Sequence, residues 1–238
     1  MNRLSSMRAT RLGGTASRTR GRMAARDICT RPRSIGAMGA LAHQEVAFRF
    51  LGRLGPAVWP RLTASRPVHV QQVFDAAWIE SVFLPLADQK ATGQTVALVD
   101  GLDFHRRSHR DAVARAYQER QRTRVYESLD VRSDGWFSTV TLQLTAMMHR
   151  HVVCSAYESH AGDRNLGAHD DEWLGVIIQM RGAKHWLVWP EATGAPEEIV
   201  TRVGDVLILP QGVKHEVSTP ELPGYSVHLV FAITDEPV

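Results

Sequence analysis

The sequence predicts a mainly β protein with flanking helices, in which an α-rich N-terminal part precedes an antiparallel β-sandwich or barrel. Two observations support this fold class. In several segments between residues 36 and 150, apolar residues recur at intervals of three and four, as they do on one face of a helix. From residue 151 onward, short β-rich runs alternate with turn residues such as Pro223-Gly224. We therefore expect helical support in residues 37–150 and a barrel core in residues 151–233.

The first 36 residues are predicted to form a basic leader. Residues 1–35 hold nine arginines against the single acid Asp27, a net charge of +8, so the total of +3 leaves −5 for residues 36–238. The leader lacks a sustained apolar pattern, and we expect it to be disordered or an artefact of start-site choice. A transit peptide and a basic arm for an anionic partner stay open. Residues 37–238 are expected to form a single domain, whose mild acidity argues against nucleic-acid binding.

Four helices and one strand are predicted in the N-terminal part. The helices are expected over residues 36–54, 75–86, 108–124 and 139–148, and the strand over residues 95–99. Pro56 should end the first helix, because proline breaks the backbone hydrogen-bond ladder. The third helix should begin at Ser108, since the run from Ser108 to Asp111 has the pattern of a capping box.

Seven strands are predicted in the barrel region, each bounded by residues that favour turns. Their expected bounds are residues 152–157, 173–180, 184–189, 199–203, 206–209, 215–217 and 225–233. Between the second and third of these strands, Arg181-Gly182 is expected to form a turn.

A metal site is predicted from two separated stretches. His169 and Asp171 are two residues apart, so both side chains point to one face of an extended chain. His215 opens a strand that returns after the Gly-Asp-(apolar)4-Pro turn pattern of residues 204–210. Two histidines and one carboxylate leave positions open on an octahedral ion, which suits Fe(II) oxygenases that bind oxygen and a bidentate keto acid. We therefore expect these three residues to be the metal ligands and the catalytic centre.

Lys184 is predicted to bind an anion inside the barrel. It is one of only three lysines, against 25 arginines, and it starts an otherwise apolar strand on which Lys184, Trp186 and Val188 share one face. If that face lines the barrel, the buried ammonium needs an anion, because an unpaired buried charge is costly. The distal carboxylate of 2-oxoglutarate would be such an anion. The alternative is a lysine that reaches solvent from the barrel rim.

The run from His169 to Trp186 resembles the JmjC-type cupin hydroxylases, and within them the ribosomal-oxygenase and asparaginyl-hydroxylase branches. In that family a lysine that binds 2-oxoglutarate stands fifteen residues after the first histidine, as Lys184 stands after His169. The Gly-Asp-x4-Pro-x4-His stretch that ends at His215 is similar to the segment carrying the family's second histidine.

This resemblance covers residues 152–231 well, and residues 70–150 by general layout. It implies a double-stranded β-helix of the jelly-roll or cupin type, and it implies that Tyr157 and Ser226 help to bind 2-oxoglutarate. The ribosomal-oxygenase branch carries Asn-x-Tyr before its His-x-Asp motif. This sequence has Ser155-Ala156-Tyr157 there, so the asparagine contact has no counterpart.

Together these residues predict an Fe(II)- and 2-oxoglutarate-dependent dioxygenase that hydroxylates a side chain of a peptide or protein. A hydroxylase of a free or carrier-bound amino acid in a biosynthetic pathway is an alternative. Two further alternatives are a metal enzyme of the same barrel that does not use 2-oxoglutarate, and a non-catalytic cupin-like protein that binds a metal or ligand. Lys184 discriminates against the metal enzyme that does not use 2-oxoglutarate, because that enzyme needs no partner for a distal carboxylate. A non-catalytic protein would show no keto-acid-dependent oxygen uptake.

The expected partners are this substrate and molecular oxygen, with a homodimer left open. No nucleic acid is expected to bind the folded domain, and no membrane, since no stretch approaches the roughly 18 apolar residues that span a bilayer. Cys29 and Cys154 are isolated and form no C-x-x-C pair, which favours a reducing compartment, and we expect the cytoplasm. A second metal pair at His149 and His151 is a lesser alternative to surface histidines.

Overall fold

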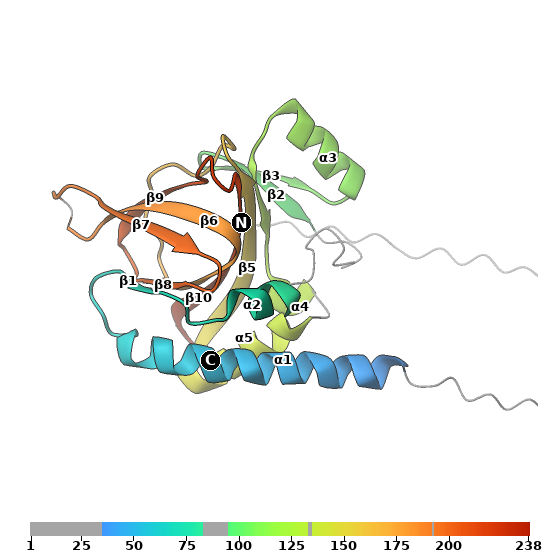
Figure 1. Ribbon diagram of the computed structural model, residues 1–238. Helices are drawn as coiled ribbons and strands as arrows, with labels where there is room; N and C mark the ends of the chain where they lie inside the picture. The colour runs from blue at the N-terminus through green and yellow to red at the C-terminus, as the bar shows by residue number, and fades with distance from the viewer. Residues whose placement is uncertain (1–34, 83–94, 133–134, 192) are drawn as a thin grey trace, which may run out of the picture. The chain divides into compact units, whose positions relative to one another are not determined.

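The computed structural model is shown in Figure 1. It describes residues 35–82, 95–132, 135–191 and 193–238. The predicted leader lies outside these residues up to residue 34, and so does the end of the predicted helix 75–86 from residue 83 onward. In the described part, no helix combines the length and the apolar character that crossing a bilayer requires.

The described chain alternates between helices and strands before it enters a run of strands. The helices are α1 (Ile35–Val58), α2 (Ala76–Val82), α3 (Arg110–Glu119), α4 (Leu129–Arg132) and α5 (Trp136–Met148), with the short 3-10 turn η1 (Trp59–Arg61). The strands are β1 (Val68–Val70), β2 (Val96–Asp100), β3 (Asp103–Arg107), β4 (Thr123–Tyr126), β5 (Arg150–His160), β6 (Leu174–Trp189), β7 (Glu197–Arg202), β8 (Val206–Leu209), β9 (Lys214–Ser218) and β10 (Tyr225–Pro237).

Helices α1 and α5 cover one side of the sheet. Helix α1 lies along α5, as Figure 1 shows, and α5 packs on β5. The buried ring of Phe50 on α1 lies 4.7 Å from the ring of Trp136 on α5 and 6.1 Å from that of Phe231 on β10. The apolar stripe of α1 continues through Val58, so the helix runs past Pro56 instead of ending there.

The predicted helix over residues 108–124 is wrong at both ends. Helix α3 begins at Arg110, with His109 as its N-cap and no side-chain capping hydrogen bond, so the predicted capping box does not form. The helix ends at Glu119, and residues 123–126 form β4 between β2 and β5. The side chains of Thr123, Val125 and Tyr126 on this strand are buried. Pairing with two neighbouring strands therefore overrides the local helical pattern.

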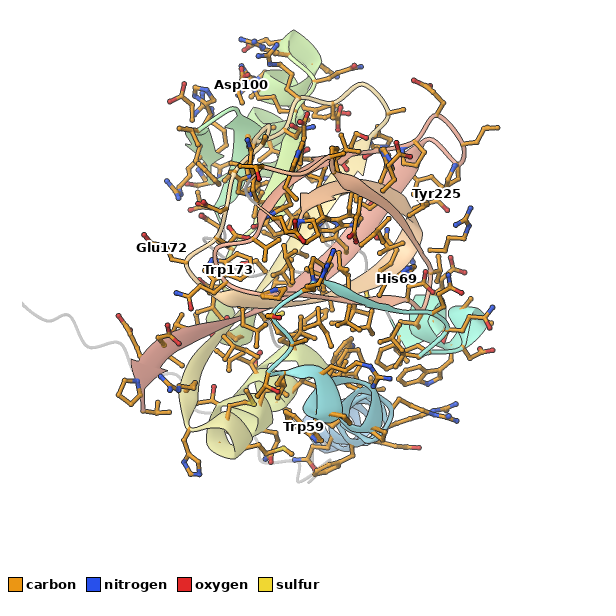
Figure 2. All side chains as sticks on the ribbon, turned by 90° about the vertical axis from the view of Figure 1, so that its left-hand side faces the viewer. Trp59, His69, Asp100, Glu172, Trp173 and Tyr225 are labelled. Atoms are coloured by element: carbon orange, nitrogen blue, oxygen red, sulfur yellow. The ribbon has the colours of Figure 1, made fainter. Side chains whose placement is uncertain are left out.

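The strands pair antiparallel in the order β1-β8-β6-β10-β5-β4-β2-β3, with β7 and β9 paired to the second half of β6. The predicted fold class, mainly β with flanking helices, is confirmed. The N-terminal part also contributes β1, β3 and β4, which the apolar spacing did not predict. Trp173 and Tyr225, just before β6 and at the start of β10, lie on opposite sides of the barrel in Figure 2, as antiparallel pairing requires.

Strand β6 connects the two halves of the barrel. The predicted strands 173–180 and 184–189 are one continuous strand, and Arg181-Gly182 is a kink within it rather than a turn. Gly182 has φ +64°, and a Cβ built on it would lie 2.0 Å from the carbonyl oxygen of Tyr225. Only glycine permits both this conformation and this close approach. The kink lets one strand pair with β8 and β10 first and with β7 and β9 afterwards.

Candidate metal centre and adjoining cavity

The three predicted ligands come together at one end of the barrel. The main-chain N–H of His169 donates to the carbonyl of His215 at 2.9 Å, and the N–H of His215 donates to the carbonyl of His169 at 2.7 Å. The N–H of Gly212 donates to the carbonyl of Asp171 at 2.9 Å. These bonds tie the loop before β6 to the start of β9. The ligand atoms of His169, Asp171 and His215 all lie within 4.8 Å of one another.

Each histidine is oriented by a bond to a nearby carbonyl. The Nδ1 atom of His169 lies 2.9 Å from the carbonyl of Gly167, and that of His215 lies 3.0 Å from the carbonyl of Val213. A carbonyl only accepts, so Nδ1 carries the proton in both rings and Nε2 keeps its lone pair. The two Nε2 atoms lie 3.8 Å and 3.6 Å from the oxygens of Asp171. This is the tautomer and arrangement that a metal ion needs.

The protonation states also fit a metal site. Burial lowers the pKa of His215 to about 4, against the opposing hydrogen bond to Val213. Burial raises the pKa of Asp171 to about 6, while His169 lowers it and Asp170 raises it further. At neutral pH His215 is therefore neutral and Asp171 mostly ionised. Metal binding requires these forms, because protonated ligands cannot coordinate.

A cavity adjoins the three ligands. Its lining combines the ligands, Lys184, aromatic rings and aliphatic side chains: Val99, Thr123, Tyr157, Asn165, Leu166, His169, Asp171, Trp173, Ile177, Lys184, Trp186, Leu209, His215, Val217, His228 and Val230. Asp171 is the single carboxylate in this lining, among the residues that the structure describes. Trp173 forms part of the wall near the ligands, beside the surface residue Glu172 that Figure 2 also labels. The wall is otherwise mainly apolar.

Lys184 extends into the barrel and is 1% exposed. Its ammonium donates to the hydroxyl of Ser159 at 2.8 Å and to that of Thr219 at 3.2 Å. No carboxylate of the described residues forms an ion pair with it. Burial lowers the pKa of Lys184 to about 8, and the more distant Asp163 raises it. The chain thus holds a buried cation beside the cavity with hydroxyl partners alone.

The two remaining predicted binding residues differ in their position. Tyr157 lines the cavity, and burial raises the pKa of its hydroxyl. Ser226 is not among the residues that line the cavity, so its binding of 2-oxoglutarate stays a prediction. It is fully buried, and its hydroxyl accepts from the Nε2 atom of Gln179 at 2.9 Å. The strand pattern alone does not reveal this bond to the buried Gln179 amide.

Sequence reasoning did not assign a role to His228. This ring lines the cavity at 3% exposure, and its Nδ1 atom has no hydrogen-bond partner in the described residues. A signal was present, since His228 stands two residues from Ser226 on an apolar strand and therefore shares its inward face. His149 and His151, the alternative metal pair, are both exposed and are not part of the cluster of ligand atoms.

Comparisons with known proteins agree with this architecture. A family model described as JmjC domain matches residues 135–236. Ribosomal oxygenase 2 of Mus musculus is 28% identical over 96 residues, which is 34% of this chain and 21% of that protein. Ribosomal oxygenase 2 of Bos taurus matches with the same identity and coverage. The predicted resemblance to the JmjC-type oxygenases is confirmed by these matches.

Solved structures share the fold. YcfD, a ribosomal oxygenase from Escherichia coli, matches with a TM-score of 0.52 and 15% identity, over 76% of this chain and 52% of that one. Its complex with cobalt and succinic acid matches with a TM-score of 0.52 and 17% identity, over 73% and 49% of the two chains. These likenesses confirm the cupin-type barrel. The chain covers about half of the solved structures and 21% of the curated relatives.

Proposed function

We propose that this chain, whose residues 135–236 match the JmjC domain, is an Fe(II)- and 2-oxoglutarate-dependent dioxygenase that hydroxylates a side chain of a peptide or protein. One observation carries the proposal. Two histidines and one carboxylate place their ligand atoms within 4.8 Å of one another, next to a cavity that holds a buried ammonium without a carboxylate partner in the described part of the chain. A metal site alone does not require that ammonium.

The residues fit Fe(II). His169 and His215 would bind it through Nε2, because their Nδ1 atoms donate to backbone carbonyls, and Asp171 would supply the carboxylate. Three protein ligands leave coordination positions for other molecules, as in Fe(II) oxygenases of the two-histidine, one-carboxylate type. Bound together, iron and a 2-keto acid supply the activation of molecular oxygen. The chain itself contributes the orientation of the ligands.

Lys184 would hold the far end of the keto acid. An ammonium has three N–H donors, of which two are used by Ser159 and Thr219. The third is left for an anion. A carboxylate there would compensate the buried charge, and the low polarity of the surroundings would strengthen the pair. Ser159 and Thr219 would act by orienting the ammonium, since their hydroxyls also lie 2.7 Å from each other.

The walls of the cavity would exclude water from the reacting groups. Trp173, Ile177 and Leu209 present apolar surface beside the ligands, which limits access of solvent to the site. A peptide or protein substrate is supported by the relatives, which are named as ribosomal oxygenases. The cavity has no free carboxylate among its described lining residues, so a neutral reacting side chain fits it better than a cationic one.

The test is turnover of purified protein with Fe(II), 2-oxoglutarate, oxygen and a pool of candidate peptides and amino acids. We expect iron-dependent succinate formation, measured by NMR, and a mass gain of one oxygen atom on a substrate. Lys184→Met should abolish both, whereas Lys214→Met, at the exposed lysine that contacts the ring of Trp189, should not. Product formation without succinate in wild type and in Lys184→Met would support a different metal enzyme. Metal binding without any turnover would support a non-catalytic protein.

A further inference from the structure

His228 is a buried ring whose hydrogen-bonding capacity is unused. Its ring stacks on that of Tyr157 with centroids 5.1 Å apart and an interplanar angle of 3°. Its edge meets the ring of Trp186 at 5.6 Å and 63°. Although the side chain is only 3% exposed, no hydrogen bond to either ring nitrogen is found among the described residues, and Nδ1 is fully enclosed. A buried polar group of this kind indicates a partner that the protein chain does not supply.

The tautomer of His228 follows from its surroundings. Burial and the charge of Lys184 lower the pKa of His228 well below its ordinary value, so the ring is neutral and carries a single N–H. A buried N–H without an acceptor is rarer and more costly than an unused acceptor. The proton therefore belongs on Nε2, because Nδ1 is the enclosed nitrogen. This leaves Nε2–H as the donor, on the ring nitrogen that is not among the fully enclosed atoms, in a ring that lines the cavity.

The strand register places this donor next to the ammonium of Lys184. On β5, Tyr157 and Ser159 are two residues apart and share a face, at a spacing of about 7 Å. Ser159 accepts from the Lys184 ammonium, while Tyr157 carries the stacked ring of His228, its partner in the β5–β10 register. The Lys184 ammonium and the His228 ring thus contact neighbouring side chains, Ser159 and Tyr157, on the same face of β5. A carboxylate bound to one of them is within reach of the other.

We propose that His228 Nε2–H donates a hydrogen bond to the distal carboxylate of the keto acid that Lys184 binds, an inference that rests on the function proposed above. Lys184 has one free N–H, whereas a carboxylate offers two oxygens with about four acceptor positions. A neutral donor adds a second bond without placing a second positive charge in the barrel. His228 would therefore contribute to the preference for a dicarboxylate keto acid over a monocarboxylate one.

The test compares two keto acids on the Mn(II)-loaded protein, which does not turn over, by isothermal titration calorimetry. 2-Oxoglutarate has the distal carboxylate, and pyruvate has only the metal-chelating end. His228→Phe keeps a ring that can stack on Tyr157 but lacks both nitrogens. It should weaken 2-oxoglutarate binding about tenfold, the expected loss of one hydrogen bond to a charged group, and leave pyruvate binding within about twofold. His228→Gln, which retains an N–H donor, should recover part of the loss.

The outcomes separate this inference from the proposed function. If wild type binds Mn(II) but not 2-oxoglutarate, the proposed function fails and the role of His228 fails with it. If wild type binds 2-oxoglutarate, Lys184→Met does not, and His228→Phe binds it as wild type does, only the role of His228 is overturned. An equal loss for both keto acids also overturns it, since that result would place His228 at the metal end. Should His228→Phe not fold, the flexible His228→Met replaces it as the variant without a donor.

Discussion

His169 and His215 are joined by their main chains in both directions, at 2.9 Å and 2.7 Å. Forty-six residues separate them in sequence, yet they form a two-residue antiparallel bridge. Their rings lie 4.3 Å apart because the backbone holds them there, and each ring is further fixed by its own carbonyl partner. The geometry of the candidate metal centre is therefore built by backbone hydrogen bonds, which do not depend on an ion.

This bridge predicts that the ligand side chains can be removed without unfolding the site. His169→Ala keeps both main-chain bonds, so the free energy of unfolding should change by less than about 1 kcal/mol in metal-free protein. The affinity for Mn(II), measured by calorimetry, should fall at least about tenfold, because only two ligands remain. His151→Ala, at an exposed histidine outside the cluster, is the matched control and should bind Mn(II) as wild type does. Equal losses in the two variants would contradict the assignment.

The affinity for 2-oxoglutarate should depend on pH through Lys184. Burial lowers its pKa to about 8, and only the protonated form attracts a carboxylate. Below pH 8 Lys184 is protonated, so it should cause no change in the affinity for 2-oxoglutarate. Above pH 8 the dissociation constant should rise, by up to about tenfold per pH unit, because the ammonium must regain its proton to bind. Titrations of the Mn(II)-loaded protein between pH 7 and 9.5 measure this.

Two controls isolate the lysine in that pH experiment. Lys184→Met should bind 2-oxoglutarate weakly, and its dissociation constant should not rise above pH 8 as that of wild type does. Pyruvate, which lacks the distal carboxylate, should report any change at the metal end alone. A rise in the dissociation constant of the same size for pyruvate would assign the pH dependence to another group.

Lys184→Met should also stabilise the ligand-free protein. The folded pKa of about 8 lies below the ordinary value of 10.5, so folding disfavours the charged form and the buried ammonium lowers stability at pH 7. Methionine has a similar shape and no charge, and Ser159 and Thr219 can still bond to each other. We expect the free energy of unfolding at pH 7 to rise by about 1–3 kcal/mol.

The sign of this effect can be checked by varying pH. Between pH 8 and 10.5 the unfolded chain binds more protons at this position than the folded chain, so wild type should gain stability as pH rises. The Lys184→Met variant has no ammonium at this position, so it should not gain stability in this way as pH rises. The difference in the free energy of unfolding between variant and wild type should therefore shrink. Urea unfolding at several pH values measures it. A variant less stable than wild type at pH 7 would show that the hydroxyl bonds outweigh the cost of burial.

Gly182→Ala should be strongly destabilising. The new Cβ would lie 2.0 Å from the carbonyl oxygen of Tyr225, and the backbone has φ +64°. We expect a loss of more than about 3 kcal/mol in the free energy of unfolding, since the clash and the backbone strain add. Gly101→Ala is the matched control, because its φ is +61° with no atom within 4 Å of the Cβ. It should lose only about 1 kcal/mol. Similar losses of stability in Gly182→Ala and Gly101→Ala would mean that the backbone of β6 shifts at Gly182 and removes the clash.

Local patterns predicted the fold class better than they predicted particular elements. Short β-rich runs separated by turn residues indicated an antiparallel β domain. One of these runs, Val206–Leu209, was predicted with its correct bounds. The predicted helix over residues 108–124 included residues 123 and 124, because the capping-box pattern at Ser108 and a narrow apolar stripe fit a helix with a solvated face. Residues 123–126 form β4 because they pair with β2 and with β5, in a part of the sheet where Thr123 and Val125 are buried. The pairing partners of Thr123 and Val125 are 24 or more residues away in sequence, so a local pattern cannot contain them.

The sequence by itself determined the chemistry of the candidate site: the spacing of His169 and Asp171, the turn before His215, and the lone lysine on an apolar strand. Only the tertiary structure decided which hydrogen bonds each polar side chain could use. It placed the hydroxyl of Ser226 against Gln179, and it placed His228 in the cavity wall with no hydrogen-bond partner for Nδ1 among the residues that the structure describes. The reason is physical. Residue spacing determines the face of a strand on which a side chain lies, but the atoms it meets on that face belong to distant segments brought together by folding.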